Sequence, residues 1–305
     1  MTPRPTLVAT AIAAALLAPA PWVASDFALS LMLSCLMYVG LAVSWAMFSG
    51  ATNYLSLATA AFFGIGAYVT AWGHGTLPYA LAVALGGLAA TIFATAVGAA
   101  VLHLRGAYFA VLTFGLGELV RHAITYAEKT WAKTVGRVIT EPPAPEVVYL
   151  TVLALAMLAV ATAAAVRASR FGLALAGIGS DEERARTLGV NTRATKIAGF
   201  ALAAFFAGAL GAAVAVRWTY IEPASVFNPF IGFQTVLIAM VGGAHTLIGP
   251  IASAVVFSVL TEVLRLQFPY AYLITLGALL ILLVLYLPGG IASVFERWKW
   301  ARSHA

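Results

Sequence analysis

Charge is what this sequence has least of. Only 9% of its 305 residues are Asp, Glu, Lys or Arg, and 62% are hydrophobic, whereas ordinary globular chains are about 25% charged and roughly 45–50% apolar. So few charges cannot cover the surface of a water-soluble protein. The mean hydropathy is +0.97, and several apolar runs are long enough to cross a hydrocarbon core of about 30 Å. The composition therefore predicts an all-α, polytopic membrane protein.

Cysteine and long polar segments are also scarce. The one cysteine, Cys35, lies in an apolar run, so no internal disulfide can form and a packing role is expected. No polar stretch is long enough to build a separate soluble core, which favours a single membrane domain over residues 1–305. The net charge of +6 comes from basic residues in short connections. This placement predicts orientation in a lipid bilayer and no nucleic-acid partner.

Motifs for catalysis and for ligand binding are missing as well. The sequence has no Gly-x-x-x-x-Gly-Lys phosphate-binding loop, so we expect that this chain does not hydrolyse ATP. No pair of carboxylates and no nucleophile beside a base stands out, and the five histidines lack metal-ligand spacing. We therefore predict a protein that is not an enzyme and that binds no metal or cofactor itself.

Apolar runs predict about ten transmembrane helices, some of them short or broken. The first run follows Arg4 and precedes Pro19, a pattern that also suits a cleaved signal sequence. We favour a retained helix, because a second apolar run follows at once. The approximate bounds of the runs are 6–24, 27–48, 53–72, 78–103, 108–126, 147–167, 196–217, 229–245, 247–265 and 270–287.

The distribution of Lys and Arg predicts which helix ends face the cytoplasm. With a cytoplasmic amino terminus and ten spans, eleven basic residues fall inside and five outside, and Arg121 lies within a span. Both termini are then cytoplasmic. Residues 168–195 become a cytoplasmic loop, and residues 127–146, which include Trp131 and a Pro-rich exit, become an external loop.

The cytoplasmic loop carries a predicted helix start. Six charges of mixed sign fall within residues 181–193. Ser180 is a plausible N-cap with Glu183 at the capping-box position, and Asp181 and Glu182 suit the first turn of a helix.

The same segment carries a predicted helix end. Gly189 with Asn191 stops the helix after about two turns, so that Ala185 and Leu188 can face a neighbour while the charges face water. A short rigid helix between two spans suits a motor protein that pushes on a membrane domain. A solvated loop that only sets topology is the alternative.

Several blocks of this sequence resemble one family of transport proteins. Residues 171–211 are similar to the conserved cytoplasmic loop of permease subunits of ATP-binding-cassette importers of the high-affinity branched-chain amino acid type. Blocks at 50–68, 104–121, 241–250 and 287–292 resemble the family too, so the resemblance covers roughly residues 27–295. In the cytoplasmic loop, the matching positions are Asp181, Glu182, Glu183, Ala185, Leu188, Gly189 and Asn191.

The resemblance implies a type II importer permease in a bacterial inner membrane, with the helix of residues 180–191 docked in a cleft of an ATPase. The implied cargo is branched-chain or related amino acids. The implied partners are two cytoplasmic ATP-binding subunits, which bind ATP and Mg²⁺, a second homologous permease subunit, and a periplasmic or external solute-binding protein. Whether the second permease is identical to this chain is left open.

Polar and small residues inside the apolar runs are the candidates for the translocation pathway. Interrupted helices in the two halves of a transporter commonly line a midplane pathway, and close packing through small residues is the alternative, favoured for the glycines. The acidic and basic candidates share a helix face and could equally form a structural ion pair. The candidates are Asn53, Ser56, Thr59, Gly64, Glu118, Arg121, Gly242 and Gly243.

Two alternative functions stay open from the sequence. The external segment 130–137 departs from the Gly-rich, polar pattern of the family, so a permease of the same family for urea or short amides is one alternative. A self-sufficient secondary transporter or channel is the other, because broken helices serve it equally well. Such a carrier is expected to hold more intramembrane acids than Glu118 and Glu262.

Overall fold

The protein is described here from a computed structural model, which covers residues 3–104, 106–268, 274–275 and 277–278. The predicted span 270–287 and the family block 287–292 therefore lie almost wholly outside the described residues. In chain order the elements are α1 (Pro3–Leu17), α2 (Ala20–Val23), α3 (Asp26–Trp45), the π-helix η1 (Ala46–Gly50), α4 (Thr59–Gly73), α5 (Tyr79–Val101), α6 (Ala107–Ala127), the π-helix η2 (Glu128–Ala132), β1 (Arg137–Val138), α7 (Pro145–Ala168), α8 (Arg170–Ser180), α9 (Glu182–Thr187), α10 (Thr192–Ala215), β2 (Tyr220–Ile221), α11 (Pro223–Val226), α12 (Pro229–Gly242) and α13 (Ile248–Gln267).

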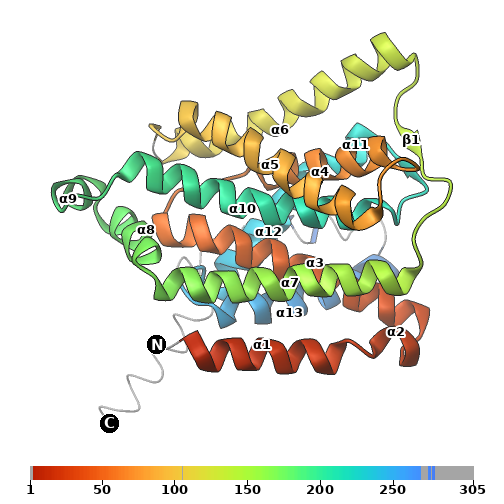
Figure 1. Ribbon diagram of the computed structural model, residues 1–305, viewed down its shortest axis with the longest axis horizontal. Helices are drawn as coiled ribbons and strands as arrows, with labels where there is room; N and C mark the ends of the chain where they lie inside the picture. The colour runs from red at the N-terminus through yellow and green to blue at the C-terminus, as the bar shows by residue number, and fades with distance from the viewer. Residues whose placement is uncertain (1–2, 105, 269–273, 276, 279–305) are drawn as a thin grey trace.

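The long helices run side by side along the long axis of the molecule (Figure 1). Within the described chain, six helical segments are long and apolar enough to cross a membrane. Helix α4, with 15 residues, is shorter than a full span. The fold is therefore all-α and polytopic, and the count of ten spans stays a prediction. The six segments are Asp26–Gly50, Tyr79–Val101, Pro145–Ala168, Thr192–Ala215, Pro223–Gly242 and Ile248–Gln267.

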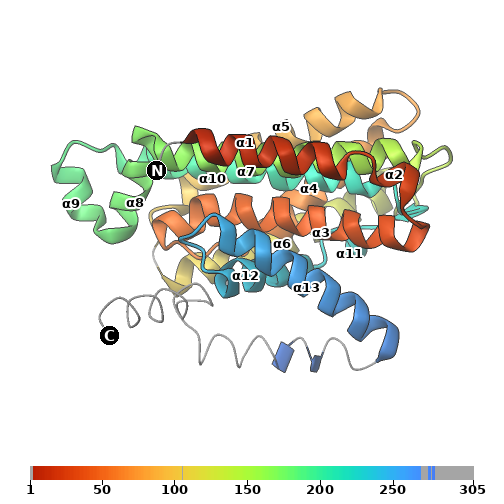
Figure 2. The same ribbon diagram turned by 90° about the horizontal axis from the view of Figure 1, so that it is seen from below.

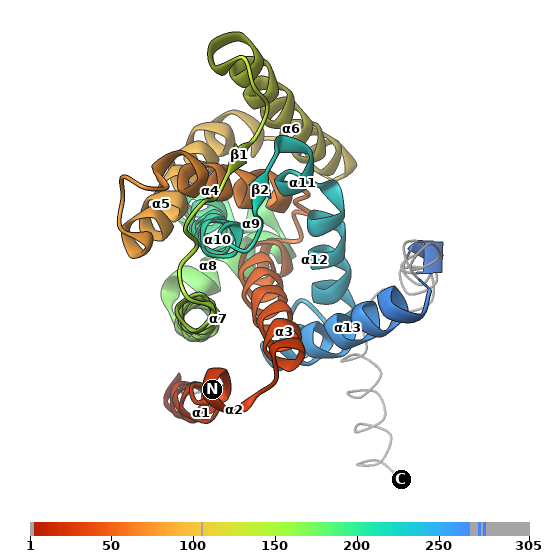
Figure 3. The same ribbon diagram turned by 90° about the vertical axis from the view of Figure 1, so that its right-hand side faces the viewer.

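Helix α10 is the most deeply buried of these six and lies at the centre of the bundle (Figure 3). Its small residues allow backbones to touch. A Cβ added at Gly66 of α4 would lie 1.8 Å from the carbonyl oxygen of Gly208, and one at Gly211 would lie 2.0 Å from that of Phe63. Apolar contact alone gives no preference between a neighbouring helix and lipid, so close approach through small residues holds membrane helices together.

The two long connections lie at opposite ends of this bundle. Helices α8 and α9 extend beyond the other helices at one end, which we call the coupling end, and β1 and α11 lie at the other, the outer end (Figures 1 and 2). Strands β1 and β2 pair antiparallel, with Arg137 opposite Ile221 and Val138 opposite Tyr220. This pairing fastens the predicted external loop to the connection that follows α10.

The chain is not helical over residues 53–58, at the start of the run 53–72 that predicted a continuous span. Helix α3 ends in η1, and regular structure resumes only at Thr59. Asn53 has φ +59°, a left-handed conformation that Asn adopts more readily than most residues. Side chains satisfy the freed amides: Thr113 Oγ1 of α6 accepts from Leu57 N at 3.0 Å, and Ser56 Oγ accepts from Ala58 N at 3.3 Å. Such partners are needed because an unpaired backbone group in hydrocarbon costs several kcal/mol.

Three other predicted boundaries are corrected. The first predicted span is divided into α1 and α2 at residues 18–19, and the run 229–245 ends as a helix at Gly242 because Gly243 takes φ +89°. The loop 168–195 contains a second helix, α8, that the sequence pattern did not predict. Its three glycines lower helix propensity. Two of them allow close packing, since a Cβ at Gly172 would lie 2.0 Å from Val166 O and one at Gly179 would lie 2.2 Å from Ala51 O.

Candidate functional site

Helix α9 begins at a different residue from the one predicted. Ser180 is the last residue of α8, so it does not cap α9. Asp181 is the N-cap, and its Oδ1 accepts from the backbone N–H groups of Glu183 and Arg184, both at 3.0 Å. A carboxylate at this position also interacts favourably with the positive end of the helix dipole. Helices α8 and α9 are therefore separated by one extended residue and form a hairpin.

The end of α9 follows the prediction and is closely tied to α10. Gly189, with φ +87°, donates from its N–H to Arg186 O at 3.0 Å, and Val190 N donates to Ala185 O at 3.1 Å. This pair of bonds is a Schellman motif, which requires a left-handed residue, usually glycine. Asn191 Oδ1 then accepts from Ala194 N at 3.1 Å and starts α10. The connection between α9 and α10 has thus a defined geometry.

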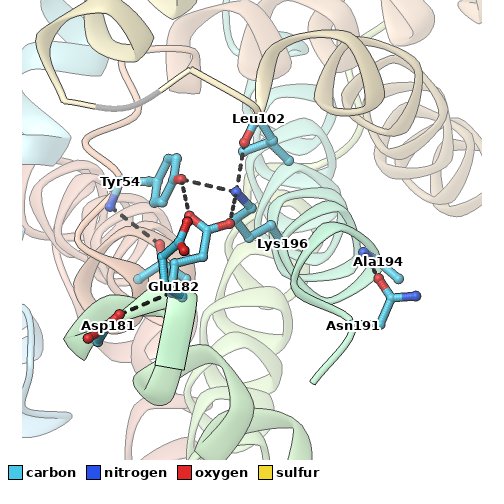
Figure 4. A network of polar contacts seen from close by, with 9 residues as sticks. Tyr54, Leu102, Asp181, Glu182, Asn191, Ala194 and Lys196 are labelled. Carbon is cyan, nitrogen blue, oxygen red and sulfur yellow. Dashed lines mark hydrogen bonds and ion pairs between the residues drawn. The ribbon is translucent and has the colours of Figure 1, made fainter. Parts of the chain in front are cut away.

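A buried cluster of polar groups attaches α9 to the bundle (Figure 4). Lys196 Nζ, from the second turn of α10, lies 2.6 Å from Glu182 Oε1 of α9. The same ammonium group donates to Tyr54 Oη at 3.0 Å and to Leu102 O at 2.8 Å. Tyr54 Oη in turn donates to Glu182 Oε2 at 2.8 Å. We call these four residues the Lys196 cluster.

The Lys196 cluster is a buried ion pair whose partners are well satisfied. The side chains of Lys196 and Glu182 are only 5% and 8% exposed. Taking two charges out of water is costly unless their remaining donors and acceptors are filled. Here the ammonium group has three oxygen partners and also lies 4.7 Å from the centroid of the Tyr54 ring. The prediction that the charges of α9 all face water is therefore wrong for Glu182.

The outward face of α9 combines exposed charges with one exposed apolar side chain. Glu183, Arg184 and Arg186 are exposed. Ala185 is buried against the protein, whereas Leu188 is 80% exposed. The prediction that both apolar residues pack on a neighbour holds within this chain only for Ala185. Leu188 is thus an exposed apolar side chain among charged ones.

Two further sets of contacts lie at the base of the α8–α9 hairpin. Asn53 Nδ2 donates to Gly179 O at 3.0 Å, which places this pathway candidate at the coupling end. Arg167, at the end of α7, donates to the carbonyl oxygens of Ala244, His245 and Thr246 at 3.2, 2.9 and 2.8 Å. The α12–α13 turn is thereby held beside the α7–α8 junction. A groove of about 540 Å³ runs between these segments.

The structure separates the pathway candidates into two groups. Ser56 and Thr59 are buried and border a cavity of about 20 Å³ together with Ser44 and Ser49, enough space for about one water molecule. Glu118 and Arg121 form an ion pair on α6, each about 30% exposed. No hydrogen bond or ion pair joins that pair to the serine-lined cavity in the described part of the chain.

Two of the glycine candidates lie at close helix contacts. A Cβ at Gly64 would lie 2.4 Å from the ring of Phe227, and one at Gly242 would lie 2.3 Å from the backbone of Gly249. Gly243 forms the left-handed C-cap of α12. Steric fit at Gly64 and Gly242 and the positive φ of Gly243 account for glycine without a role in transport, and a pathway role stays a prediction.

Sequence reasoning did not identify three residues of this site. Tyr54 reads as part of an apolar run, Lys196 as an orientation charge, and Arg167 as an interfacial charge. The signal for Lys196 was its position within an otherwise apolar helix, since a buried Lys needs an acidic partner. Nothing in the sequence indicates which acid that is.

Comparisons with known proteins identify the family of this chain. Residues 27–285 match the model of the family described as "Branched-chain amino acid transport system / permease component". The chain is 26% identical over 306 residues to the high-affinity branched-chain amino acid transport system permease protein LivM of Escherichia coli K12, covering 89% of this chain and 71% of that protein. The LivM protein of Salmonella typhimurium LT2 is similar to the same extent. No solved structure matches. Since the family model spans most of the sequence, this chain belongs to the family of permease components of branched-chain amino acid transport systems.

Proposed function

We propose that this chain is the membrane permease of an ATP-driven importer that carries branched-chain or related amino acids across a bacterial inner membrane. The observation that carries the proposal is the Lys196 cluster. It joins a charged, exposed knob at one end of the molecule to the central helix of the membrane bundle. A solvated topology loop has no need of a buried ion pair at its base.

The charges support a cytoplasmic coupling end. Six basic residues lie in the segment 167–196 at the coupling end, whereas five, Lys129, Lys133, Arg137, Arg217 and Arg265, lie in or next to elements that end at the outer end. Cytoplasmic connections carry the excess of Lys and Arg in membrane proteins. This count supports the α8–α9 hairpin on the cytoplasmic side, together with the amino terminus.

The contacts suggest how movement is transmitted. A partner that pushes on α9 acts through the Schellman turn and the Lys196 cluster on α10, which packs on α3, α4, α5 and α7. The same push acts through Arg167 on the α12–α13 turn. Because these connections are short and hydrogen-bonded, the helices shift as rigid bodies, and alternating access follows from repacking between them.

The partners and cargo follow from the family. Two ATP-binding subunits supply the energy and bind ATP and Mg²⁺, a second permease subunit completes the pathway, and an external solute-binding protein delivers the cargo. In this proposal, ATP and Mg²⁺ bind to those subunits and not to this chain. The relatives carry branched-chain amino acid transport in their names, and that shared description supports the cargo.

Co-purification with the ATP-binding subunits of its importer tests this function. Leu188→Glu places a carboxylate on the exposed apolar position of α9, so we expect the ATPase to be lost while the permease stays folded. Val138→Glu is the matched control, because Val138 is 59% exposed at the opposite end. Equal ATPase recovery with both variants would contradict the docking role, and solute transport by the purified chain without any ATPase would refute the function.

A further inference from the structure

The outer end holds a cavity that the coupling site does not use. Its volume is about 460 Å³, within the range of small-molecule sites in proteins. It lies between the first turns of α3, the first turns of α7 and the end of α10, and the Pro-rich segment 142–145 forms part of its rim. Because proline fixes φ, this part of the rim is preformed. The cavity is therefore held open by three helices and a stiff segment.

The cavity wall has an apolar part. Leu33, Val148 and Val216 line it and are only 4%, 3% and 3% exposed in total. Leu29 of α3 adds a further aliphatic side chain. These four side chains come from α3, from α7 and from the segment just after α10, so the apolar part is enclosed on several sides. A branched aliphatic group suits such a surface.

Two opposite charges border the same cavity without pairing. Asp26 of α3 and Arg217, which follows α10, both line it. Among the described residues, Asp26 makes no ion pair or side-chain hydrogen bond, and Arg217 Nη2 donates to the neutral Ser30 Oγ at 2.7 Å. Burial lowers the pKa of Arg217 from its ordinary value, but a guanidinium stays charged at neutral pH.

The placement of these two charges suits the head of an α-amino acid. Ser30 lies four residues after Asp26 on α3, so the two side chains share a face about one helical turn, or about 5.4 Å, apart. Arg217, hydrogen-bonded to Ser30, lies against the same face of α3 as Asp26, and all three line the cavity. An ammonium and a carboxylate on one carbon atom can bridge two such groups, with one hydrogen-bonded contact at each end.

We propose that this cavity is an external binding site for a zwitterionic, branched aliphatic amino acid, with Asp26 binding its ammonium group, Arg217 its carboxylate, and the apolar wall its side chain. The site rests on the proposed function, since it lies at the end where an external binding protein delivers solute. It would give the permease its own selection for cargo, in addition to that of the binding protein.

Equilibrium binding of radiolabelled leucine to the complete importer in nanodiscs, without the solute-binding protein, tests the site. We expect leucine to bind at least about tenfold more tightly than leucinamide, which lacks the carboxylate, and 4-methylpentanoate, which lacks the ammonium group. Asp26→Asn should weaken leucine binding about tenfold and abolish discrimination against 4-methylpentanoate. Arg217→Gln should likewise weaken leucine binding about tenfold, and it should abolish discrimination against leucinamide.

Two control variants and a test for bound lipid distinguish the possible results. Glu146→Gln and Lys129→Gln make the same charge changes at the outer end but not in the cavity wall, so they should leave leucine binding unchanged. Unchanged binding in Asp26→Asn and Arg217→Gln, or no leucine binding by the wild type at millimolar concentrations, would overturn the site. So would retention of phosphatidylethanolamine that depends on Asp26 and Arg217, because the cavity would then hold a lipid headgroup.

The same preparation distinguishes this site from the function on which it rests. ATP-dependent uptake by the wild-type importer with its loaded binding protein is measured in parallel. Normal uptake with unaltered leucine binding in both variants refutes the cavity site alone. Uptake that needs no ATPase refutes the proposed function itself.

Discussion

At the scale of single residues, the Lys196 cluster shows how one buried charge depends on its partner. Glu182 Oε1 and Lys196 Nζ are 2.6 Å apart, and both side chains are nearly inaccessible to solvent. Removing one member of a buried ion pair leaves the other charge desolvated and uncompensated. Removing both charges avoids that penalty. The pair therefore predicts strong coupling between two positions that are 14 residues apart in the sequence.

Lys196→Met should therefore destabilise the protein by about 3–5 kcal/mol, whereas Lys196→Met combined with Glu182→Gln should recover most of that loss. Thermal unfolding of the detergent-solubilised variants measures both effects. Arg193→Met is the matched control, since Arg193 is an exposed cation one turn earlier on α10, and it should change stability by less than about 0.5 kcal/mol. Additive losses in the double variant would show that the two charges are not coupled.

At the scale of elements, the short helix α9 depends on its two ends more than a long helix does. It has six residues, so most of its backbone N–H and C=O groups lack a partner within the helix. Asp181 satisfies two of these donors, and the turn at Gly189 satisfies carbonyls at the other end. The caps therefore decide whether α9 stays ordered.

Asp181→Ala should weaken α9 by about 1 kcal/mol and speed hydrogen exchange of its amides about fivefold, with α10 unaffected. Ser180→Ala is the informative control. The sequence pattern assigns the cap to Ser180, whereas the structure assigns it to Asp181, so only the second substitution should speed exchange. Faster exchange in Ser180→Ala with none in Asp181→Ala would mean that α9 begins one residue earlier.

Prediction from sequence succeeded where an element is defined by its own residues. The runs 78–103, 108–126 and 147–167 match α5, α6 and α7 to within two residues at each end, because length and apolarity define them locally. It failed at the start of the run 53–72, where the non-helical residues 53–58 depend on hydrogen bonds from distant side chains such as Thr113. Helix α8 was missed because its glycines argue against a helix in the sequence. Their reason is visible only in the structure, where two of them pack against the backbone of other segments.

The same distinction applies to the candidate site. A helix start near Asp181 and Glu182 and an end at Gly189 could be predicted because first-turn acids and a stop glycine are local patterns, although the cap itself was assigned to Ser180 instead of Asp181. The residues that they contact could not be identified in the same way. Glu182 is paired with Lys196 and with Tyr54, which lies 128 residues away in the chain. Sequence spacing carries no information on contacts of that range.

At the scale of the whole molecule, the connections between successive long helices lie alternately at the coupling end and at the outer end in the described part of the chain. The Lys196 cluster places Tyr54, Leu102 and Glu182 together at the coupling end. The outer cavity places residues 26, 142–145 and 217 together at the other. A membrane lying across the helices must then separate α9 from the 127–146 connection, whichever side each faces.

The orientation of the bundle in the membrane can be measured by cysteine labelling, because the sequence contains one native cysteine, Cys35, to be replaced. In a Cys35→Ala background, Leu188→Cys and Trp131→Cys introduce thiols at positions that are 80% and 83% exposed at opposite ends. We expect a membrane-impermeant maleimide to label Trp131→Cys from outside intact cells, and Leu188→Cys only in inside-out vesicles. Both thiols should react in detergent, which shows that each is accessible. Labelling of Leu188→Cys from outside would place α9 beyond the reach of a cytoplasmic ATPase, and the coupling function would then be wrong.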